Sequence, residues 1–270
     1  MKNILFIPNN AGFFSNFNKI ITHIWIFKIR NLIDDNTNFY VKWFDYIDFK
    51  YGGDNLWSTL FTSLIPAENS EKTEYDTIIK EYYHQEEEKF ISTHTHNILN
   101  KDDKRWRYEL NQIYNKYIQL NPIFKEEVNS FYKKHFEGYY VICVHIRSSF
   151  HKNEQYNRDM ISVHDRINII NDHIKTLKVQ YKIYLATDII DAIDIFKNIY
   201  NDKLVYLDTN KEYYRDNQDH SVLNSSINKG KAIMKDALLL SMGNILFHSI
   251  SNVTFAALFI NPDIPNVYIY

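Results

Sequence analysis

The amino-acid sequence predicts an α/β protein with two Rossmann-like lobes and a helical middle segment. Two observations carry this prediction. At both ends of the chain, apolar runs of strand length alternate with longer segments whose apolar residues have helical spacing. Between them, residues 68–135 are polar with apolar residues at helical intervals. Near-continuous apolar strands that alternate with helices are typical of doubly wound parallel sheets.

The N-terminal lobe is predicted over residues 1–135 and opens with a buried strand at 3–8 (NILFIP). A loop follows in which Gly12 permits an unusual backbone angle. A strongly apolar helix and a second strand at 38–44 complete the parallel unit. Helices are expected in the polar middle segment. The last of them covers 120–136, begins near Pro122 and ends at Gly138.

The C-terminal lobe is predicted over residues 136–270, where strands and helices alternate regularly. Such an alternation indicates a parallel sheet with helices on its faces. The expected strands cover 139–146, 181–188, 203–208, 244–249 and 266–270, and the expected helices cover 160–178, 189–200, 229–243 and 251–260.

Composition excludes several classes of protein. The chain of 270 residues has 31 basic and 33 acidic side chains, a net charge of −2, which argues against broad nucleic-acid binding. It has one cysteine, so no disulfide can form within it. The apolar run at the start is too short for a signal peptide, and no stretch reaches the length of a membrane span. A cytoplasmic protein is expected.

The most informative residues follow the first strand of the C-terminal lobe. In VICVHIRSSF (141–150), His145 and Arg147 stand at the end of an apolar strand, on one face by the alternation of side chains. In doubly wound sheets, ligands bind beyond the carboxyl ends of the strands. Arginine stays charged and grips phosphate with two donors. The alternative is a buried structural pair between Arg147 and a carboxylate.

Other strand ends add polar residues. Asp188 follows the strand at 181–188, either as a ligand contact or as a helix cap. At the start of the helix at 251–260, backbone N–H groups and hydroxyls form an anion site, or the serines merely cap the helix. The loop around Gly12 and Asn16 is either a donor or acceptor contact or a plain turn. An arginine, an aspartate and a polar helix start suit a sugar nucleotide. The residues expected at that helix start are Ser249, Ser251 and Asn252.

Three segments resemble the peptide motifs of the fucosyltransferase superfamily, which includes α1,6-, α1,2-, nodulation-type and protein O-fucosyltransferases. They are VICVHIRSSF, KIYLATDIIDAIDIFKNIY and DALLLSMGNILFHSISNVTFAALF. The resemblance covers about residues 120–262, and the N-terminal lobe matches only through its Gly12 loop. It implies a GT-B-like fold, a GDP-sugar donor and a glycan or other hydroxyl acceptor.

The resemblance also implies roles for single residues. Arg147 would hold the β-phosphate and assist its departure, and His145 would contact the nucleoside or the phosphate. Asp236 matches a residue that recognises guanine. The remaining matches are Thr187 and Asp188 in the second motif, and Ser251 and Asn252 as the phosphate-facing pair of the third.

The sequence departs from the family after Arg147, where Ser148 and Phe150 replace a second arginine and an aspartate. The donor sugar is therefore open: GDP-fucose is expected first, and the alternative is another nucleotide sugar such as GDP-mannose. An inverting transfer needs a base. Glu154 and Asp159, in the loop after Arg147, are the candidates, with Glu154 favoured, although each also fits a solvated loop carboxylate.

No metal or other cofactor is expected. The histidines of STHTH (92–96) lack cysteine partners and the helical spacing of a zinc site. Two further functions stay open on the same fold: another sugar-nucleotide enzyme, such as an epimerase or phosphorylase, and a non-catalytic sugar-nucleotide or glycan-binding protein.

Overall fold

A computed structural model describes residues 2–7, 12–41, 54–66, 74–79, 104–147, 161–207 and 227–269. The chain divides into two compact units. The N-terminal unit comprises 1–125, 225–231 and 259–262, and the C-terminal unit comprises the rest. They differ from the predicted lobes because 126–135 belong to the C-terminal unit and two late segments belong to the N-terminal one. Each of these segments lies at least partly in a helix that crosses the boundary between the two units. No local sequence pattern marks a boundary inside a helix.

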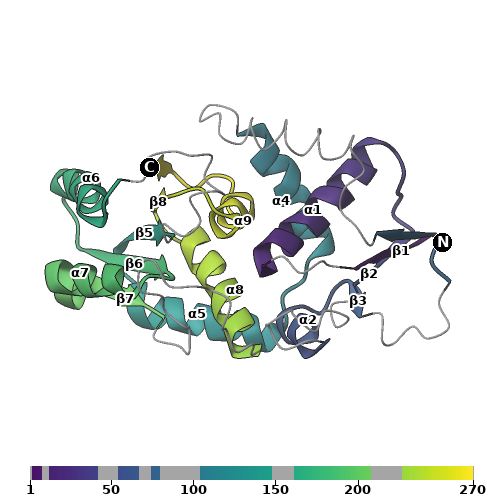
Figure 1. Cartoon of the computed structure of the whole chain (residues 1–270), viewed down its shortest axis with the longest axis horizontal. Coiled ribbons are helices and arrows are strands. Elements are labelled where there is room, and N and C mark those ends of the chain that lie inside the picture. Colours follow the sequence, from purple (N-terminus) through teal and green to yellow (C-terminus); the bar gives the residue numbers. More distant parts are fainter. Residues whose placement is uncertain are drawn as a thin grey trace. The chain divides into compact units, whose positions relative to one another are not determined.

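The N-terminal unit is built on a four-stranded parallel sheet with the order β3-β2-β1-β4 (Figure 1). The strands at 3–8 and 38–44 are confirmed as β1 and β2. The strands are β1 (Lys2–Phe6), β2 (Thr37–Val41), β3 (Ile65–Pro66) and β4 (Thr77–Ile79), and the helices are α1 (Phe13–Ile29), α2 (Asp54–Leu60) and α4 (Arg105–Tyr117).

Aromatic packing forms the core of this unit. The Phe17 ring, on α1, lies 5.5 Å from the Phe61 ring and 6.4 Å from the Phe259 ring, both nearly parallel to it. Helix α4 lies beside α1, and its Tyr114 ring meets Phe17 edge-on at 6.5 Å (Figure 1). The apolar residues of α1, except Ile29 at its end, are buried because the helix has packing partners on several sides.

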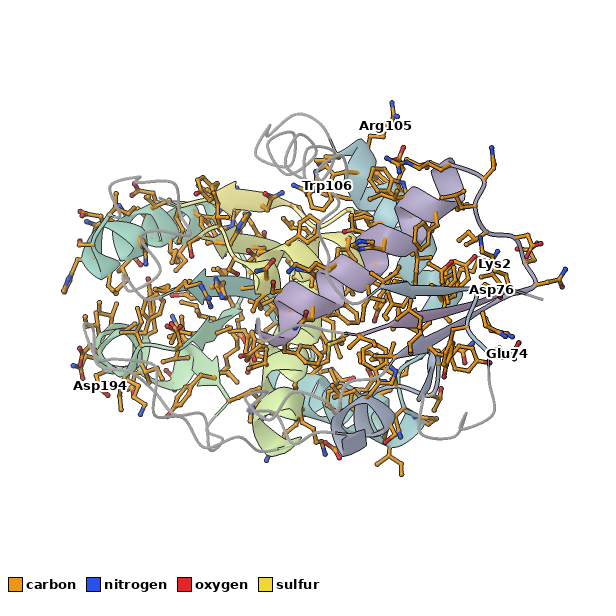
Figure 2. The ribbon with its side chains drawn as sticks, turned by 45° about the vertical axis from the view of Figure 1, so that its right-hand side comes forward. Lys2, Glu74, Asp76, Arg105, Trp106 and Asp194 are labelled. Atoms are coloured by element: carbon orange, nitrogen blue, oxygen red, sulfur yellow. The ribbon has the colours of Figure 1, made fainter. Side chains whose placement is uncertain are left out.

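Residues 77–79, which the sequence placed in a helical segment, form the edge strand β4 instead. Asp76 fixes its register, because the Asn3 backbone N–H donates to the Asp76 carboxylate at 2.7 Å and the Asp76 N–H donates to the Asn3 carbonyl at 2.9 Å. Figure 2 shows Asp76 and Glu74 beside Lys2 at this end of the sheet. The prediction of a helix here is wrong because pairing with a strand about 70 residues away decided the conformation.

The C-terminal unit is built on a five-stranded parallel sheet with the order β7-β6-β5-β8-β9, which confirms the predicted alternation (Figure 1). The order reverses between β5 and β8. The elements are α5 (Pro122–Phe136), β5 (Tyr140–Ile146), α6 (Val163–Thr176), β6 (Tyr181–Thr187), α7 (Ile190–Tyr200), η3 (Asn201–Lys203), β7 (Leu204–Tyr206), α8 (Ile227–Ser241), β8 (Ile245–His248), α9 (Asn252–Ile260) and β9 (Asn266–Tyr268).

Alternate side chains of these strands bury on opposite faces of the sheet. On one face, Ile142, Val144 and Ile146 pack with residues of α6 and α7. On the other face, Cys143 donates to the Leu239 carbonyl of α8 at 3.5 Å. The near-continuous apolar sequence of β5 follows because both faces of the sheet are covered.

Two residues fix how β5 begins. Gly138 has φ +83°, a left-handed conformation that ends α5. The Asn244 side chain accepts from the Val141 N–H at 2.7 Å, and the Asn244 N–H donates to the Val141 carbonyl at 2.9 Å. This reciprocal pair sets the register of β8 against β5.

None of the helices in the described ranges is both long enough and apolar enough to cross a bilayer.

Candidate functional site

The candidate site lies at the carboxyl ends of β5 and β8, where the strand order of the C-terminal sheet reverses. Parallel pairing sets His145 opposite His248, and Ser249 follows at once. At such a reversal point, the connections that follow the two neighbouring strands run to opposite sides of the sheet. Polar side chains and helix starts therefore gather between them. The residues that follow both strands are the ones that the sequence singled out.

Ser251 caps α9 and also faces His145. Its Oγ accepts from the Thr254 N–H at 3.1 Å, the hydrogen bond expected of a serine cap. The same Oγ lies 3.5 Å from His145 Nε2. The cap that the sequence predicted is therefore present, and it brings the end of β5 and the start of α9 within contact distance.

Thr254, which the sequence analysis missed, holds this loop in shape. It is 2% exposed. Its Oγ1 donates to the Ser249 carbonyl at 3.1 Å and accepts from the Ser251 N–H at 3.2 Å. The pattern Ser-x-x-Thr at the start of an apolar helix was the available signal. The loop before α9 is thus fixed by side-chain hydrogen bonds from within the helix.

Ser249 is 2% exposed, and its hydroxyl has no hydrogen-bond partner among the residues that the structure describes. Its backbone N–H donates to the His145 carbonyl at 3.4 Å. A buried hydroxyl without a partner costs free energy unless a ligand or water satisfies it. It stands next to the positive end of the α9 dipole, an arrangement that favours an anion.

Three other predicted residues lie at this edge of the sheet, and of these Thr187 is buried. Arg147 follows β5 directly and is half-buried. Thr187 ends β6 beside Ile146, and its Oγ1 accepts from the Ile189 N–H at 3.1 Å. Asp188 is half-buried but is not the cap of α7, because that helix starts one residue later, after Ile189, with no side-chain cap.

Asp236 lies away from the strand ends. On α8, it accepts a hydrogen bond of 2.6 Å from the Tyr184 hydroxyl, and both side chains are buried. Tyr184 pairs with Cys143, three residues before the end of β6. Tyr184 had no role in the sequence analysis, because only the fold brings α8 onto this face of β6. Recognition of guanine by Asp236 stays a prediction.

Two predicted residues belong to the N-terminal unit. Gly12 is exposed and caps α1 with φ −61°, a conformation open to any residue, so the unusual angle that glycine permits is not used. An added Cβ would meet nothing within 4 Å. Asn16, in the first turn of α1, is fully buried, and its N–H donates to the Gly12 carbonyl at 3.2 Å.

Some predictions fall outside the described residues. These are the base candidates Glu154 and Asp159, the departures Ser148 and Phe150, and the histidines at 92–96. Within the described ranges, no three histidine, cysteine or acidic side chains group in a way that could hold a metal ion. Asn252 is described, and it is exposed at the first position of α9.

Comparison with known proteins finds likeness in structure alone. No family model matches the sequence, and no curated protein matches it. Among solved structures, fucosyltransferase NodZ from Bradyrhizobium aligns with 97% of this chain and 93% of its own, at 14% identity and a TM-score of 0.58. NodZ has been described as an α-1,6-fucosyltransferase and soaked with GDP-fucose.

Two further structures agree with this match. Arabidopsis thaliana FUT1, in complex with GDP, aligns with 100% of this chain and 70% of its own, at 11% identity and a TM-score of 0.58. POFUT1 aligns with 99% of this chain and 97% of its own, at 9% identity and a TM-score of 0.57. The chain therefore has the GT-B-like α/β fold of the fucosyltransferase structures.

Proposed function

We propose that this protein is a glycosyltransferase that moves a sugar, L-fucose from GDP-fucose, onto a hydroxyl acceptor. The main observation behind this proposal is that the buried Ser249 hydroxyl and the Ser251 cap, at the start of α9, lie beside His145. This polar group occupies the switch point of the C-terminal sheet. The fold supports the proposal, since it is shared with NodZ, a structure of which was soaked with GDP-fucose.

The reaction breaks the bond between the sugar and the β-phosphate, so negative charge develops on the diphosphate. Arg147 supplies a permanent positive charge at the end of β5. The positive end of the α9 dipole and the buried Ser249 hydroxyl add to this charge without the need to reorganise. In this proposal these groups neutralise the leaving group without a metal ion.

His145 holds a second part of the site. Its Nε2 faces Ser251 Oγ at 3.5 Å, and its carbonyl accepts from the Ser249 N–H. His145 therefore contacts both serines of the α9 start and sets their distance from Arg147, two residues on. We assign it the phosphate side of the donor, where an imidazole donates or accepts according to its tautomer.

The remaining roles extend the same proposal. Asp236, held by the Tyr184 hydroxyl, accepts hydrogen bonds from the guanine of the donor. An inverting transfer also needs a base to remove the acceptor proton. Glu154 is the first candidate for that base and Asp159 the second, because both follow Arg147 closely in the sequence. Gly12 and Asn16 stay predicted contacts of the N-terminal unit with the donor or the acceptor, and the full burial of Asn16 makes Gly12 the stronger candidate of the two.

The experiment combines ligand binding with transfer. Thermal unfolding is followed with GDP-, UDP-, ADP- and CMP-sugars, because a ligand that binds the native state raises Tm. Stabilisation by GDP-fucose, with transfer of fucose to a hydroxyl acceptor, supports the proposal. Arg147→Ala should lower kcat by about 100- to 1000-fold, the usual cost of removing one charge-stabilising donor. Arg147→Lys should recover part of that loss, since it keeps the charge.

Full activity in Arg147→Ala would remove the central claim, and stabilisation by none of the four nucleotide sugars would remove the donor class. The departures at Ser148 and Phe150 leave the donor sugar open, so transfer from GDP-mannose is the second candidate. Stabilisation by GDP-mannose in preference to GDP-fucose would select it. Donor binding with neither transfer nor hydrolysis would instead indicate a binding protein of this fold.

A further inference from the structure

The opposite edge of the C-terminal sheet, where β5, β6 and β7 begin, carries a cluster of lysines. The chain reaches those strands through the end of α5, the 177–180 loop and η3 (Figure 1). These segments contain only two carboxylates, Glu137 and Asp202. We call this cluster the amino-edge lysine patch: Lys133, Lys134, Lys178, Lys182 and Lys203, with Lys235 of α8.

Aromatic rings connect the lysines of neighbouring segments. The Lys182 ammonium lies 5.3 Å from the centre of the Tyr139 ring and donates to the Asp202 carbonyl at 2.5 Å. The Lys203 ammonium lies 4.5 Å from the centre of the Tyr181 ring. Lysines and tyrosines therefore alternate along the starts of the three strands.

The end of α5 continues the patch onto α8. The Lys235 ammonium lies 4.6 Å from the centre of the Phe131 ring, and the His135 ring lies 4.5 Å from the same ring. Burial lowers the pKa of His135, and the charges of Lys134, Lys182 and Lys235 lower it further. These three lysines are thus close enough together to disfavour one more positive charge.

The patch is positive and exposed, and it includes apolar side chains. Among the described residues, Lys133, Lys134 and Lys203 are exposed and form no ion pair with a carboxylate. Within the same surface, Val179 is 58% exposed and Tyr139 is 38% exposed. This surface is therefore locally positive, although the net charge of the whole protein is −2.

We propose that the amino-edge lysine patch binds the surface of a membrane that contains anionic lipids. Clusters of four to eight lysines are attracted to anionic head groups, and aromatic side chains settle at the interface. The exposed Val179 favours a bilayer over a soluble polyanion, because only the bilayer has an apolar phase to receive it.

The position of the patch fits this role and separates it from the donor site. The strand β5 has seven residues, so its two ends lie roughly 20 Å apart. His145 and Arg147 stand at the far end. A membrane bound at the amino edge therefore leaves the candidate donor site of the same unit uncovered, and this inference stands whatever sugar nucleotide is used.

The test is cosedimentation of the full chain with vesicles. Vesicles of phosphatidylcholine alone are compared with vesicles that also contain phosphatidylserine, at low and high salt. We expect binding to the anionic vesicles only, weakened by salt. Each lysine near an anionic surface is worth about a fivefold change in partitioning, so the K133A/K134A/K203A variant should bind on the order of 100-fold more weakly.

A matched control removes three exposed lysines of the N-terminal unit, K28A/K104A/K125A, and should keep vesicle binding. Circular dichroism and Tm confirm that both variants fold. Val179→Ser should weaken binding to vesicles but not to heparin. Equal binding to neutral vesicles, no vesicle binding, binding to heparin alone, or equal losses in the patch and control variants would each overturn the proposal.

Discussion

Tyr184→Phe removes one buried hydrogen bond and leaves the packing around it in place. The Tyr184 hydroxyl donates to Asp236 Oδ1 at 2.6 Å, with the two residues 0% and 7% exposed. The ring packs edge-on against Phe136, with 5.8 Å between centres, and phenylalanine keeps that contact. The variant therefore isolates the hydroxyl.

The expected cost follows from the charge and burial of the acceptor. A hydrogen bond to a charged group contributes about 1.5–3 kcal/mol, and water poorly compensates a buried carboxylate that loses one of its donors. We expect Tyr184→Phe to lower the free energy of unfolding by about 2 kcal/mol. In a chain of this size that corresponds to a fall in Tm of roughly 4–8 °C.

The assay is urea and thermal unfolding of the parent, Tyr184→Phe, Asp236→Asn and the double variant, followed by circular dichroism. Tyr200→Phe is the matched control, because its hydroxyl donates to the neutral Asn171 side chain at 3.0 Å. It should cost only about 1 kcal/mol. The Kd for GDP is measured on the same variants, and we expect Tyr184→Phe to weaken it if Asp236 reads the guanine.

Two results would refute this reasoning. An unfolding free energy of Tyr184→Phe within about 0.5 kcal/mol of the parent would show that the hydrogen bond does not stabilise the fold. Additive effects of Tyr184→Phe and Asp236→Asn would show that the two side chains are not coupled. A loss of stability with an unchanged Kd for GDP would show that the hydrogen bond stabilises the fold and that Asp236 does not bind the guanine.

Three further predictions concern single positions. Gly243→Ala should lower the free energy of unfolding by about 1–3 kcal/mol, since its Cβ would lie 2.4 Å from Cys143 Sγ, and Cys143→Ala should relieve most of that loss. Gly12→Ala should change stability by less than about 0.5 kcal/mol, as its Cβ meets open space, yet lower transfer if the loop contacts a substrate. Burial and neighbouring lysines lower the pKa of His135, so the folded state resists protonation and loses stability as the pH falls below the ordinary value of 6.5. An NMR titration should show a low midpoint that rises in Lys182→Ala.

Most elements of the C-terminal unit were predictable because each carries its own signal. Six consecutive buried residues in β5 follow from a strand covered on both faces, and Gly138 marks the turn before it. The sequence also indicated the cap at Ser251, because a serine stands directly before an apolar helix. Parallel strands end at one edge, so the positions of His145 and Arg147 at that edge followed from the order of elements.

The errors arose where distant pairing decided the outcome. Thr77, Ile78 and Ile79 are β-branched, but they sit in a polar segment with helical spacing, and only pairing with β1 makes them a strand. The two-residue strand β3 carries too little sequence to be recognised. Asp188 resembled a helix cap, yet α7 begins at Ile190 with Ile189 as its cap residue. The Thr187 hydroxyl accepts the hydrogen bond from the Ile189 N–H instead.

The sequence by itself determined the class of the protein: parallel α/β units, a positive strand end after β5, and a polar start of the last long helix. These features are local, since each depends on residue type and on spacing of a few positions. Only the tertiary structure decided which of them meet. The 3.5 Å approach of His145 to Ser251 joins residues 106 positions apart, and the bond from Tyr184 to Asp236 joins residues 52 apart. Strand order and helix packing set such contacts, and neither is written in any single segment of the chain.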